Sequence, residues 1–388
     1  QATMLSGTLL QEWIIYGKPA AEAVAAEVEA LGASRVLLTS TRSLSGPGGL
    51  PETIARALGP RHAGTYSGVT AHSPRECVLA GAAQARAAQA DLLVAVGGGS
   101  VIDATKVMLL CLWQNLQTVE ALDPFSGRGR PGDPSRRPPG MESAVRMLAV
   151  PTTFSAAEFT PNAGVTDSRR KVKDGFSHPL FVPQVVVLDP AATLSTPLGL
   201  LLSTGMKAVD HAVERLCSPQ TSPYSDATGS QALTLLARAL PAIKARPQDL
   251  EARLEGQLGM WLSIIGGAAG TGVGASHALG HTLGGSYGVP HGITSCVTLP
   301  AVLRWNAAVN AERQQHLLPL LGGRGSASHR VAALVRSLGL PGRLRDVGIR
   351  RADLPAIAEH TMGDPPVRNN PRPIAGPAEL LEILKLAW

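Results

Sequence analysis

The sequence predicts an α/β domain with a parallel sheet, followed by an all-helical domain. Short apolar strands alternate with helical patterns in the first half, and the strand expected at residues 92–96 is apolar throughout. Such strands are typical of a parallel sheet that is covered on both faces. After Asp189 and Pro190 the patterns become long and helical, and 388 residues are more than one ordinary domain needs. We therefore expect domains at residues 1–190 and 191–388.

Several local patterns define the elements of the first domain. Further strands are expected at residues 34–39, 146–150 and 185–188, and a second apolar helix at residues 101–112. Ser73, followed by Pro74 and Glu76, is typical of a capping box that opens a helix running to about Ala90. Gly, Pro and Arg dominate residues 117–143, which predicts a solvated loop.

The charge balance favours a small anionic partner. The formal net charge is +6 and the isoelectric point is about 9.4. The chain has no run of five basic residues and no basic–aromatic interleaving, so nucleic-acid binding is not expected. The charge fits an anionic cofactor or a small acid, and the simpler alternative is a solvated basic surface.

The cysteines and the hydropathy pattern favour a cytoplasmic protein. Four cysteines are scattered without a CxxC pair, and Cys77 and Cys111 fall in helical apolar patterns. Buried free thiols are therefore expected, as in a reducing compartment. No apolar run of 18 residues is present, so we expect neither a transmembrane helix nor a membrane partner.

A glycine-rich turn is the sharpest local feature. Gly97, Gly98 and Gly99 follow a buried strand and open a helix, with Ser100 and Asp103 next in the chain. A turn without side chains lets phosphate oxygens reach backbone N–H groups at the positive end of a helix. The turn therefore predicts a dinucleotide site, and the alternative is a merely flexible connection.

Two other strand ends are expected to line the same site. Thr152 and Thr153 follow the strand at residues 146–150 and offer two hydroxyls, as ligand contacts or as a helix cap. Ser40 and Arg42 follow the strand that ends at Thr39, where an acid usually selects NAD(H). Because no acid is present and Arg42 could pair with a 2′-phosphate, we expect NADP(H) to be accepted at least as well as NAD(H). The alternative is that Arg42 points to solvent.

Histidines cluster in the second half. Lys207 and His211 are four residues apart and share a helix face, as do His277 and His281, and His291 follows in a Val-Pro-His-Gly turn. A lone helical histidine is usually structural. A cluster of this kind is better explained as a metal or catalytic site.

These motifs together resemble a known family. GGGSVIDATK, PTT, GMKAVDHAVE and HALGHTLGG with PHG are similar, in the same order, to motifs of the iron-containing alcohol dehydrogenases. The resemblance implies a Rossmann-like dinucleotide-binding domain, a helical domain and a metal held by one Asp and three His. The histidines that match the family's ligands are His211, His277 and His291, and His281 matches a further active-site histidine.

One ligand position departs from the family. Lys207 stands where metal-binding members have Asp, and an ammonium has no lone pair for a cation. Asp210 lies about 60° around the helix from Lys207, so it does not directly replace the missing Asp. In lacking this Asp the chain resembles the maleylacetate reductases, which work without metal and share the shorter loop from Pro151 to Glu158. Two positions differ from that subgroup, because Lys207 replaces its usual Asn and Ala157 replaces a Ser.

The resemblance leads to a catalytic hypothesis. Lys207 carries the same net charge as a divalent cation with one carboxylate, so it could stabilise a developing oxyanion in place of the metal. His281 would then donate or relay the proton. In the alternative, Lys207 pairs with Asp210 or Glu214 and points away, and the three histidines still hold iron or zinc.

The predicted function is an NAD(P)H-dependent oxidoreductase that resembles the maleylacetate reductases and acts on a small carbonyl, enone or alcohol. The alternatives are a metal-dependent alcohol dehydrogenase with iron or zinc, a lyase similar to dehydroquinate synthase, which shares the fold, and a non-catalytic binding protein. A homodimer is expected. The identity of the substrate is left open.

Overall fold

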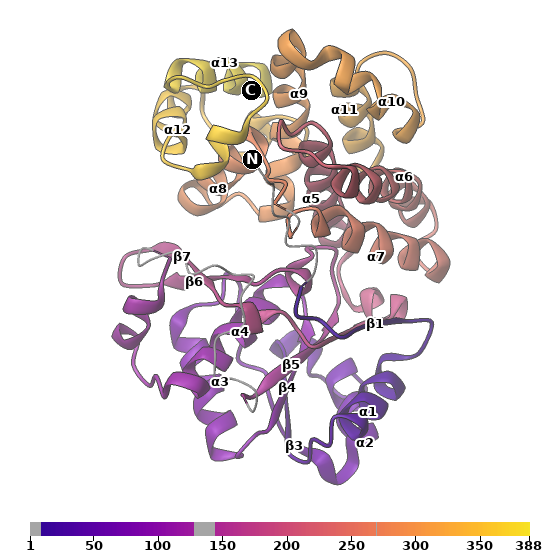
Figure 1. Ribbon diagram of the computed structural model, residues 1–388, viewed down its shortest axis with the longest axis vertical. Coiled ribbons are helices and arrows are strands. Elements are labelled where there is room, and N and C mark those ends of the chain that lie inside the picture. The colour runs from indigo at the N-terminus through magenta and orange to yellow at the C-terminus, as the bar shows by residue number, and fades with distance from the viewer. Residues whose placement is uncertain (1–8, 128–143, 269) are drawn as a thin grey trace. The chain divides into compact units, whose positions relative to one another are not determined.

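The computed structural model describes residues 9–127, 144–268 and 270–388 (Figure 1). The chain divides into two compact units, one ending at Thr196 and the other beginning at Pro197. Most of the loop expected at residues 117–143 lies outside the described residues. No helix of the described ranges is long and apolar enough to cross a membrane.

A six-stranded parallel sheet forms the first unit, in the order β1-β8-β5-β4-β2-β3. Its strands are β1 (Trp13–Tyr16), β2 (Val36–Thr39), β3 (His62–Tyr66), β4 (Leu92–Gly97), β5 (Arg146–Pro151) and β8 (Val185–Leu188). Its longer helices are α1 (Ala20–Ala30), α2 (Leu50–Leu58), α3 (Arg75–Ala87) and α4 (Gly99–Gln114). All four strands expected from the sequence lie in this sheet, so the predicted α/β class is confirmed.

The strands are apolar because both faces of the sheet are buried. Val24 of α1 and Ile54 of α2 share a fully buried cluster with Val94 of β4 and Val150 of β5. The intervening residues of β4 are also buried, and α4 contacts both β4 and β5. Removing this apolar surface from water on both faces stabilises the sheet.

The start of α3 differs from the expected capping box. The helix begins at Arg75, and no side chain caps it. Ser73 has a left-handed φ of 47°, and its hydroxyl donates to the carbonyl of Ser100 at 2.6 Å. Glu76 instead accepts a hydrogen bond from Ser168. The predicted capping box is therefore wrong, because tertiary partners take both side chains.

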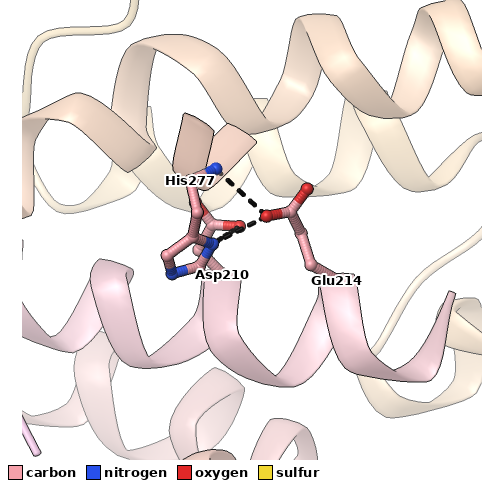
Figure 2. Close-up of side chains that lie close together, drawn as sticks. All are labelled: Asp210, Glu214 and His277. Atoms are coloured by element: carbon pink, nitrogen blue, oxygen red, sulfur yellow. Dashed lines mark hydrogen bonds and ion pairs between the residues drawn. The ribbon is translucent and has the colours of Figure 1, made fainter. Parts of the chain in front are cut away.

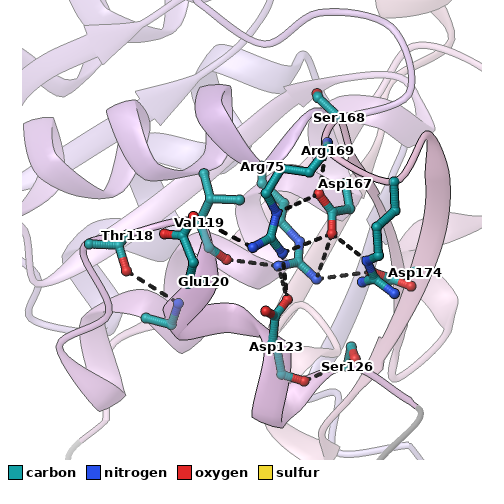
Figure 3. A network of polar contacts seen from close by, with 12 residues as sticks. Arg75, Thr118, Val119, Glu120, Asp123, Ser126, Asp167, Ser168, Arg169 and Asp174 are labelled. Carbon is teal, nitrogen blue, oxygen red and sulfur yellow. Dashed lines mark hydrogen bonds and ion pairs between the residues drawn. The ribbon is translucent and has the colours of Figure 1, made fainter.

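An antiparallel hairpin, β6 (Asn162–Asp167) with β7 (Val172–Ser177), was not expected from the sequence. Figure 3 shows the charged network at its end. The buried Arg75 donates to Asp174 at 2.9 Å and to Asp123 at 2.6 Å. Because Asp174 belongs to β7 and Arg75 to α3, the network joins the hairpin to helix α3.

The second unit is helical, as predicted. Its helices are α5 (Leu198–Leu216), α6 (Pro223–Ala245), α7 (Leu250–Ile265), α8 (Ala275–Tyr287), α9 (His291–Gln315), α10 (Leu317–Leu320), α11 (Ala327–Ser337), α12 (Leu354–Thr361) and α13 (Pro377–Ala387). Helix α5 is buried from Leu201 to Leu216 and contacts α6, α7, α8 and α9. Polar residues on α5 therefore meet other helices rather than water.

The cysteines carry free thiols. Cys111, expected to be buried, is buried, and so are Cys217 and Cys296. Cys77 was also expected to be buried, but it is only half-buried.

Candidate active site

The glycine turn between β4 and α4 has no room for side chains. Gly97 has a φ of 156°, and a Cβ there would lie 2.6 Å from Val101. A Cβ on Gly98 would lie 2.9 Å from Thr153, and one on Gly99 would lie 3.0 Å from Ser155. The first N–H groups of a helix lack partners within the helix. This turn can therefore offer backbone donors to an anion at the start of α4.

The turn lies where the strand order reverses. From β2 the sheet continues to β3 at one edge, and from β4 it continues through β5 to β8 on the other side. Thr39 of β2 pairs in register with Ala95 of β4, so the loops after these strands are neighbours. In open parallel sheets, ligands bind at the carboxyl ends of the strands at such a switch point.

Of the two residues predicted beyond β2, one is unsuited to contact a ligand. Ser40 is fully buried, and its hydroxyl donates to the carbonyl of Val96 at 2.8 Å. It joins β2 to β4 and is not accessible to a ligand, which corrects the prediction for Ser40. Arg42 is exposed in a short 3-10 helix.

The threonines after β5 pack on the glycine turn. The N–H of Thr152 donates to the carbonyl of Gly97 at 3.0 Å. Thr153 lies against Gly98, and its hydroxyl donates to Ser155 at 3.0 Å. The two predicted loops therefore meet at the same edge of the sheet.

Ser100 and Asp103 are held by neighbouring segments. The hydroxyl of Ser100 accepts a hydrogen bond from the N–H of His72 at 3.3 Å. Asp103 accepts one from the N–H of Gly164 at 3.0 Å, and burial raises its pKa. Asp103 therefore anchors the hairpin to α4.

Below the turn, the side chains of Lys106 and Glu158 are both buried, and the charge of each affects the pKa of the other. The ammonium of Lys106 donates to the carbonyls of Ala157, Thr160 and Asn162 at 2.5 to 2.8 Å. Burial lowers the pKa of Lys106 to about 8. Neither carboxylate oxygen of Glu158 has a hydrogen-bond partner among the described residues, and burial raises its pKa to about 7.

In the helical unit, Lys207 points into the protein interior. Its side chain is 1% exposed, and its ammonium donates to the hydroxyl of Thr294 on α9 at 2.8 Å. That hydroxyl donates in turn to the carbonyl of His291 at 2.7 Å. Burial lowers the pKa of Lys207, and the charges of Asp210 and other neighbours oppose this shift. Within the described ranges no ion pair joins Lys207 to Asp210 or Glu214, so the alternative pairing expected from the sequence is absent there.

His211 and His277 meet as predicted from their shared motif positions. Their rings stack with centroids 4.7 Å apart. Burial lowers the pKa of both imidazoles well below the ordinary value, and nearby cations add to the effect. Burial therefore favours the neutral form of both rings. Nδ1 of His211 and Nε2 of His277 are buried and have no hydrogen-bond partner in the described part of the chain.

Two carboxylates, Asp210 and Glu214, lie close to His277 (Figure 2). Nδ1 of His277 is 2.7 Å from Glu214 and 3.6 Å from Asp210. Asp210 accepts hydrogen bonds at 2.6 Å from the hydroxyls of Ser276 and Ser295. Burial raises the pKa of Asp210 to about 7.

The other two predicted histidines lie outside this buried cluster. His281 is half-exposed, and its Nδ1 is 2.8 Å from Asp364. His291 is exposed at the first residue of α9. The structure thus brings together Lys207, His211 and His277, and the carbonyl of His291 is linked to Lys207 through the hydroxyl of Thr294.

The residues do not fit the metal of the family. Within the described ranges, donor atoms close enough for one ion come from Asp210, Glu214 and His277, rather than from the three expected histidines. Glu214 already accepts two backbone N–H donors and contacts Nδ1 of His277, and Asp210 accepts two hydroxyls. The nearby ammonium of Lys207 also repels a cation.

Sequence reasoning did not identify the partners that shape this cluster. Glu214 was considered only as an ion-pair partner of Lys207, although it lies seven residues further along and therefore on the same helix face. Thr294, Ser276 and Asp364 gave no signal. Their roles depend on contacts between helices that are distant in sequence.

Family models match both units. The iron-containing alcohol dehydrogenase model matches residues 12–190, and the C-terminal model of the Fe-containing alcohol dehydrogenase family matches residues 201–388. The two matches include the glycine turn and the histidine cluster.

Individual relatives match almost the full chain. A dehydrogenase, FUM7, from Gibberella moniliformis is 35% identical over 97% of this chain and 96% of its own. A maleylacetate reductase from Rhizobium sp. strain MTP-10005 is 31% identical over 91% of this chain and 89% of its own. The crystal structure of maleylacetate reductase from that strain has a TM-score of 0.82 and 29% identity, covering 100% of this chain and 99% of its own. The chain therefore belongs to the iron-containing alcohol dehydrogenase family, in the subgroup that resembles the maleylacetate reductases, and is a dehydrogenase or reductase.

Proposed function

We propose that this protein is an NAD(P)H-dependent reductase of a small carbonyl or enone acid and that it works without a metal ion. The observation that carries the proposal is the buried ammonium of Lys207, which occupies the position of the family's Asp ligand and donates to Thr294. A buried cation that lacks an ion-pair partner can stabilise negative charge on a reacting oxygen.

The coenzyme site is assigned to the carboxyl ends of β2, β4 and β5. The proposed contacts are Arg42, Gly97, Gly98, Gly99, Ser100, Thr152 and Thr153, with Asp103 anchoring the wall behind them. Arg42 is the candidate partner of a 2′-phosphate, so NADP(H) should serve at least as well as NAD(H). A sulfoacetaldehyde reductase with the same fold is known in complex with NAD+.

Lys207 and His281 have separate roles in the proposed reduction. A nicotinamide coenzyme held by the contacts proposed above would supply the hydride to the substrate carbon. Lys207 stabilises the charge that develops on the substrate oxygen. His281 donates the proton that completes the reduction, because an imidazole can act as a general acid and Asp364 holds its Nδ1.

The substrate class follows from charge and from the relatives. The chain carries a net charge of +6, and several of its relatives are named maleylacetate reductases. Both facts favour a small anionic carbonyl compound over a neutral alcohol.

The competing function is an iron- or zinc-dependent alcohol dehydrogenase. The observation that favours it is the pair of unpartnered ring nitrogens on His211 and His277. In that case His291 would have to turn towards them to complete the three-histidine set.

One experiment separates the two functions. NADPH and NADH oxidation is followed with a panel of small keto acids, enones and aldehydes, before and after dialysis against chelator, and metal content is determined on the same preparation. Reduction of anionic substrates that survives chelation supports the proposal. Activity that requires stoichiometric iron or zinc overturns it.

A homodimer is the proposed assembly. Strand β1 lies at the edge of the sheet, and Trp13 and Tyr16 on it are 63% and 53% exposed. Exposed aromatic residues on an unpaired strand edge favour pairing with another chain. Sedimentation equilibrium of the wild type and of Trp13→Lys should give a dimer and a weakened dimer.

A further inference from the structure

Glu214 binds the start of one helix and the ring of a histidine at the same time. It lies in the last turn of α5, facing the N-terminus of α8 (Figure 2). One carboxylate oxygen accepts the N–H of Ser276 at 3.0 Å. The other accepts the N–H of His277 at 3.1 Å and lies 2.7 Å from Nδ1 of the same residue.

The chain leaves room for this contact at Gly274. A Cβ at this position would lie 2.9 Å from a carboxylate oxygen of Glu214. Any other residue would therefore push Glu214 away from the helix terminus. The positive end of a helix also favours an ionised carboxylate.

The contacts determine where the imidazole proton of His277 lies. Backbone N–H groups can only donate, so the carboxylate of Glu214 acts as an acceptor at both oxygens. Burial raises the pKa of Glu214, but its two backbone N–H donors oppose this shift and favour the carboxylate, for which Nδ1 of His277 is the donor in the 2.7 Å contact. The second carboxylate, Asp210, lies 3.6 Å from the same nitrogen and favours the same arrangement. A neutral ring with a hydrogen on Nδ1 has a lone pair on Nε2.

That lone pair has an unusual environment. Nε2 of His277 is buried and has no hydrogen-bond partner in the described part of the chain. Buried polar atoms are rarely left unsatisfied, and such an atom commonly marks a ligand or water position. The ring of His211 stacks on that of His277. Within the described residues no group donates a hydrogen bond to Nε2 of His277.

We propose that Glu214 is a positioning residue that keeps His277 in the Nδ1–H form, so that Nε2 accepts a hydrogen bond from the ligand. The inference deepens the proposed function by naming the ligand chemistry. Lys207 supplies a donor and His277 an acceptor, so the site suits a hydroxyl beside a carbonyl or carboxylate oxygen. A ligand with acceptor oxygens alone would satisfy Lys207 but leave Nε2 of His277 without a partner.

The direct test is nuclear magnetic resonance of the full-length wild-type protein labelled with ¹⁵N-histidine. Long-range ¹H–¹⁵N correlations report which ring nitrogen is protonated, and His277 is assigned by loss of its signals in His277→Gln. The expected result is a protonated Nδ1 and an unprotonated Nε2. The opposite tautomer, or a doubly protonated ring, overturns the proposal.

Substitution tests the role of Glu214 in that tautomer. Glu214→Gln keeps the size of the side chain but removes the charge and turns one acceptor into a donor. Both tautomers of His277 should then appear, and kcat should fall about 10- to 100-fold while the KM of the coenzyme changes little. The matched control is Glu255→Gln, which alters a partly exposed partner of Arg238 and should change neither measurement. An unchanged tautomer in a folded Glu214→Gln protein contradicts the assigned role.

The proposed reductase function and the proposed role of Glu214 can be contradicted independently of each other. The tautomer of His277 is measured without substrate, so it stands or falls even if no reductase activity is found. Reductase activity with the opposite tautomer would leave the proposed function in place and remove only the role of Glu214. If Glu214→Gln does not fold, the wild-type spectrum still decides.

Discussion

The rings of His211 and His277 stack with their centroids 4.7 Å apart and their planes 18° from parallel. This arrangement is compatible with two neutral rings, and burial keeps the pKa of both well below the ordinary value. Two imidazolium ions at this distance would repel each other in a medium of low dielectric constant. Positive charge near this pair comes from Lys207 and Arg215, which lower the pKa of both rings.

Lys207→Met should abolish most of the reductase activity. Methionine keeps a similar length and removes the charge, so kcat should fall roughly 10²-fold or more while the protein stays folded. Steady-state kinetics with the best substrate, combined with circular dichroism, checks this. Lys244→Met, on the exposed face of α6, is the control and should be unchanged. A fully active Lys207→Met enzyme would remove Lys207 from the mechanism.

Gly98→Ala should weaken binding of NADPH at least about tenfold. The added methyl occupies the space where phosphate approaches the backbone, but it also comes within 2.9 Å of Thr153. The double variant Gly98→Ala/Thr153→Ser removes the methyl group of Thr153 and separates these causes. Fluorescence titration should find both variants equally weak. Recovery in the double variant would show that packing, rather than loss of phosphate contact, caused the defect.

Arg42→Ala should raise the KM of NADPH about tenfold and leave that of NADH almost unchanged. A charge-assisted hydrogen bond to the 2′-phosphate is worth about 1.5 to 3 kcal/mol, and NADH has no such group. Arg56→Ala, which removes an exposed arginine of α2, is the control. Equal effects of Arg42→Ala on both coenzymes, or a strong preference of the wild type for NADH, would contradict this assignment.

Glu158 should make stability decrease as the pH rises. Its pKa is raised from 4.5 to about 7 by burial, so the folded protein holds a proton that the unfolded chain releases. The stabilising effect is complete below pH 4.5 and is lost as the pH rises through 7, to an extent of up to about 3 kcal/mol. Glu158→Gln should remove this pH dependence, so its stability relative to wild type should be greater at pH 8 than at pH 5.5. Urea unfolding at both values checks it, and parallel pH profiles of the two proteins would rule it out.

Arg75→Met should lower the free energy of unfolding by about 2 kcal/mol or more. The substitution leaves the carbonyl of Val119 without its buried donor and removes one of the arginines that neutralise Asp174. Arg238→Met breaks an exposed ion pair with Glu255 and should cost less than about 1 kcal/mol. Urea midpoints of the two variants give the comparison. Equal small losses would mean that Arg170, which also pairs with Asp174, is sufficient.

The amino-acid sequence was sufficient to predict the fold class and several elements of the first unit. The apolar strand that became β4 and the glycines after it could be identified because strand burial and turn conformation depend on neighbouring residues. The motifs placed His211 and His277 in one candidate site, and in the structure their rings stack. The hairpin β6–β7 was missed because its partly charged strands lack a strong alternation, and ion pairs to Arg75 of a distant helix hold it in place.

The roles of individual polar side chains were decided only by the tertiary structure. Ser73 fits a local capping rule, but its hydroxyl bonds to Ser100. Ser40 follows a strand at the expected place for a ligand contact, yet it donates to Val96 inside the sheet. In the sequence, nothing distinguishes Glu214 from other acidic residues on a helix. In the fold, its carboxylate accepts backbone N–H groups at the N-terminus of α8. Local rules describe what a residue can do with its sequence neighbours. A buried polar group must find partners wherever the fold provides them, because leaving it unsatisfied costs more than breaking a local preference.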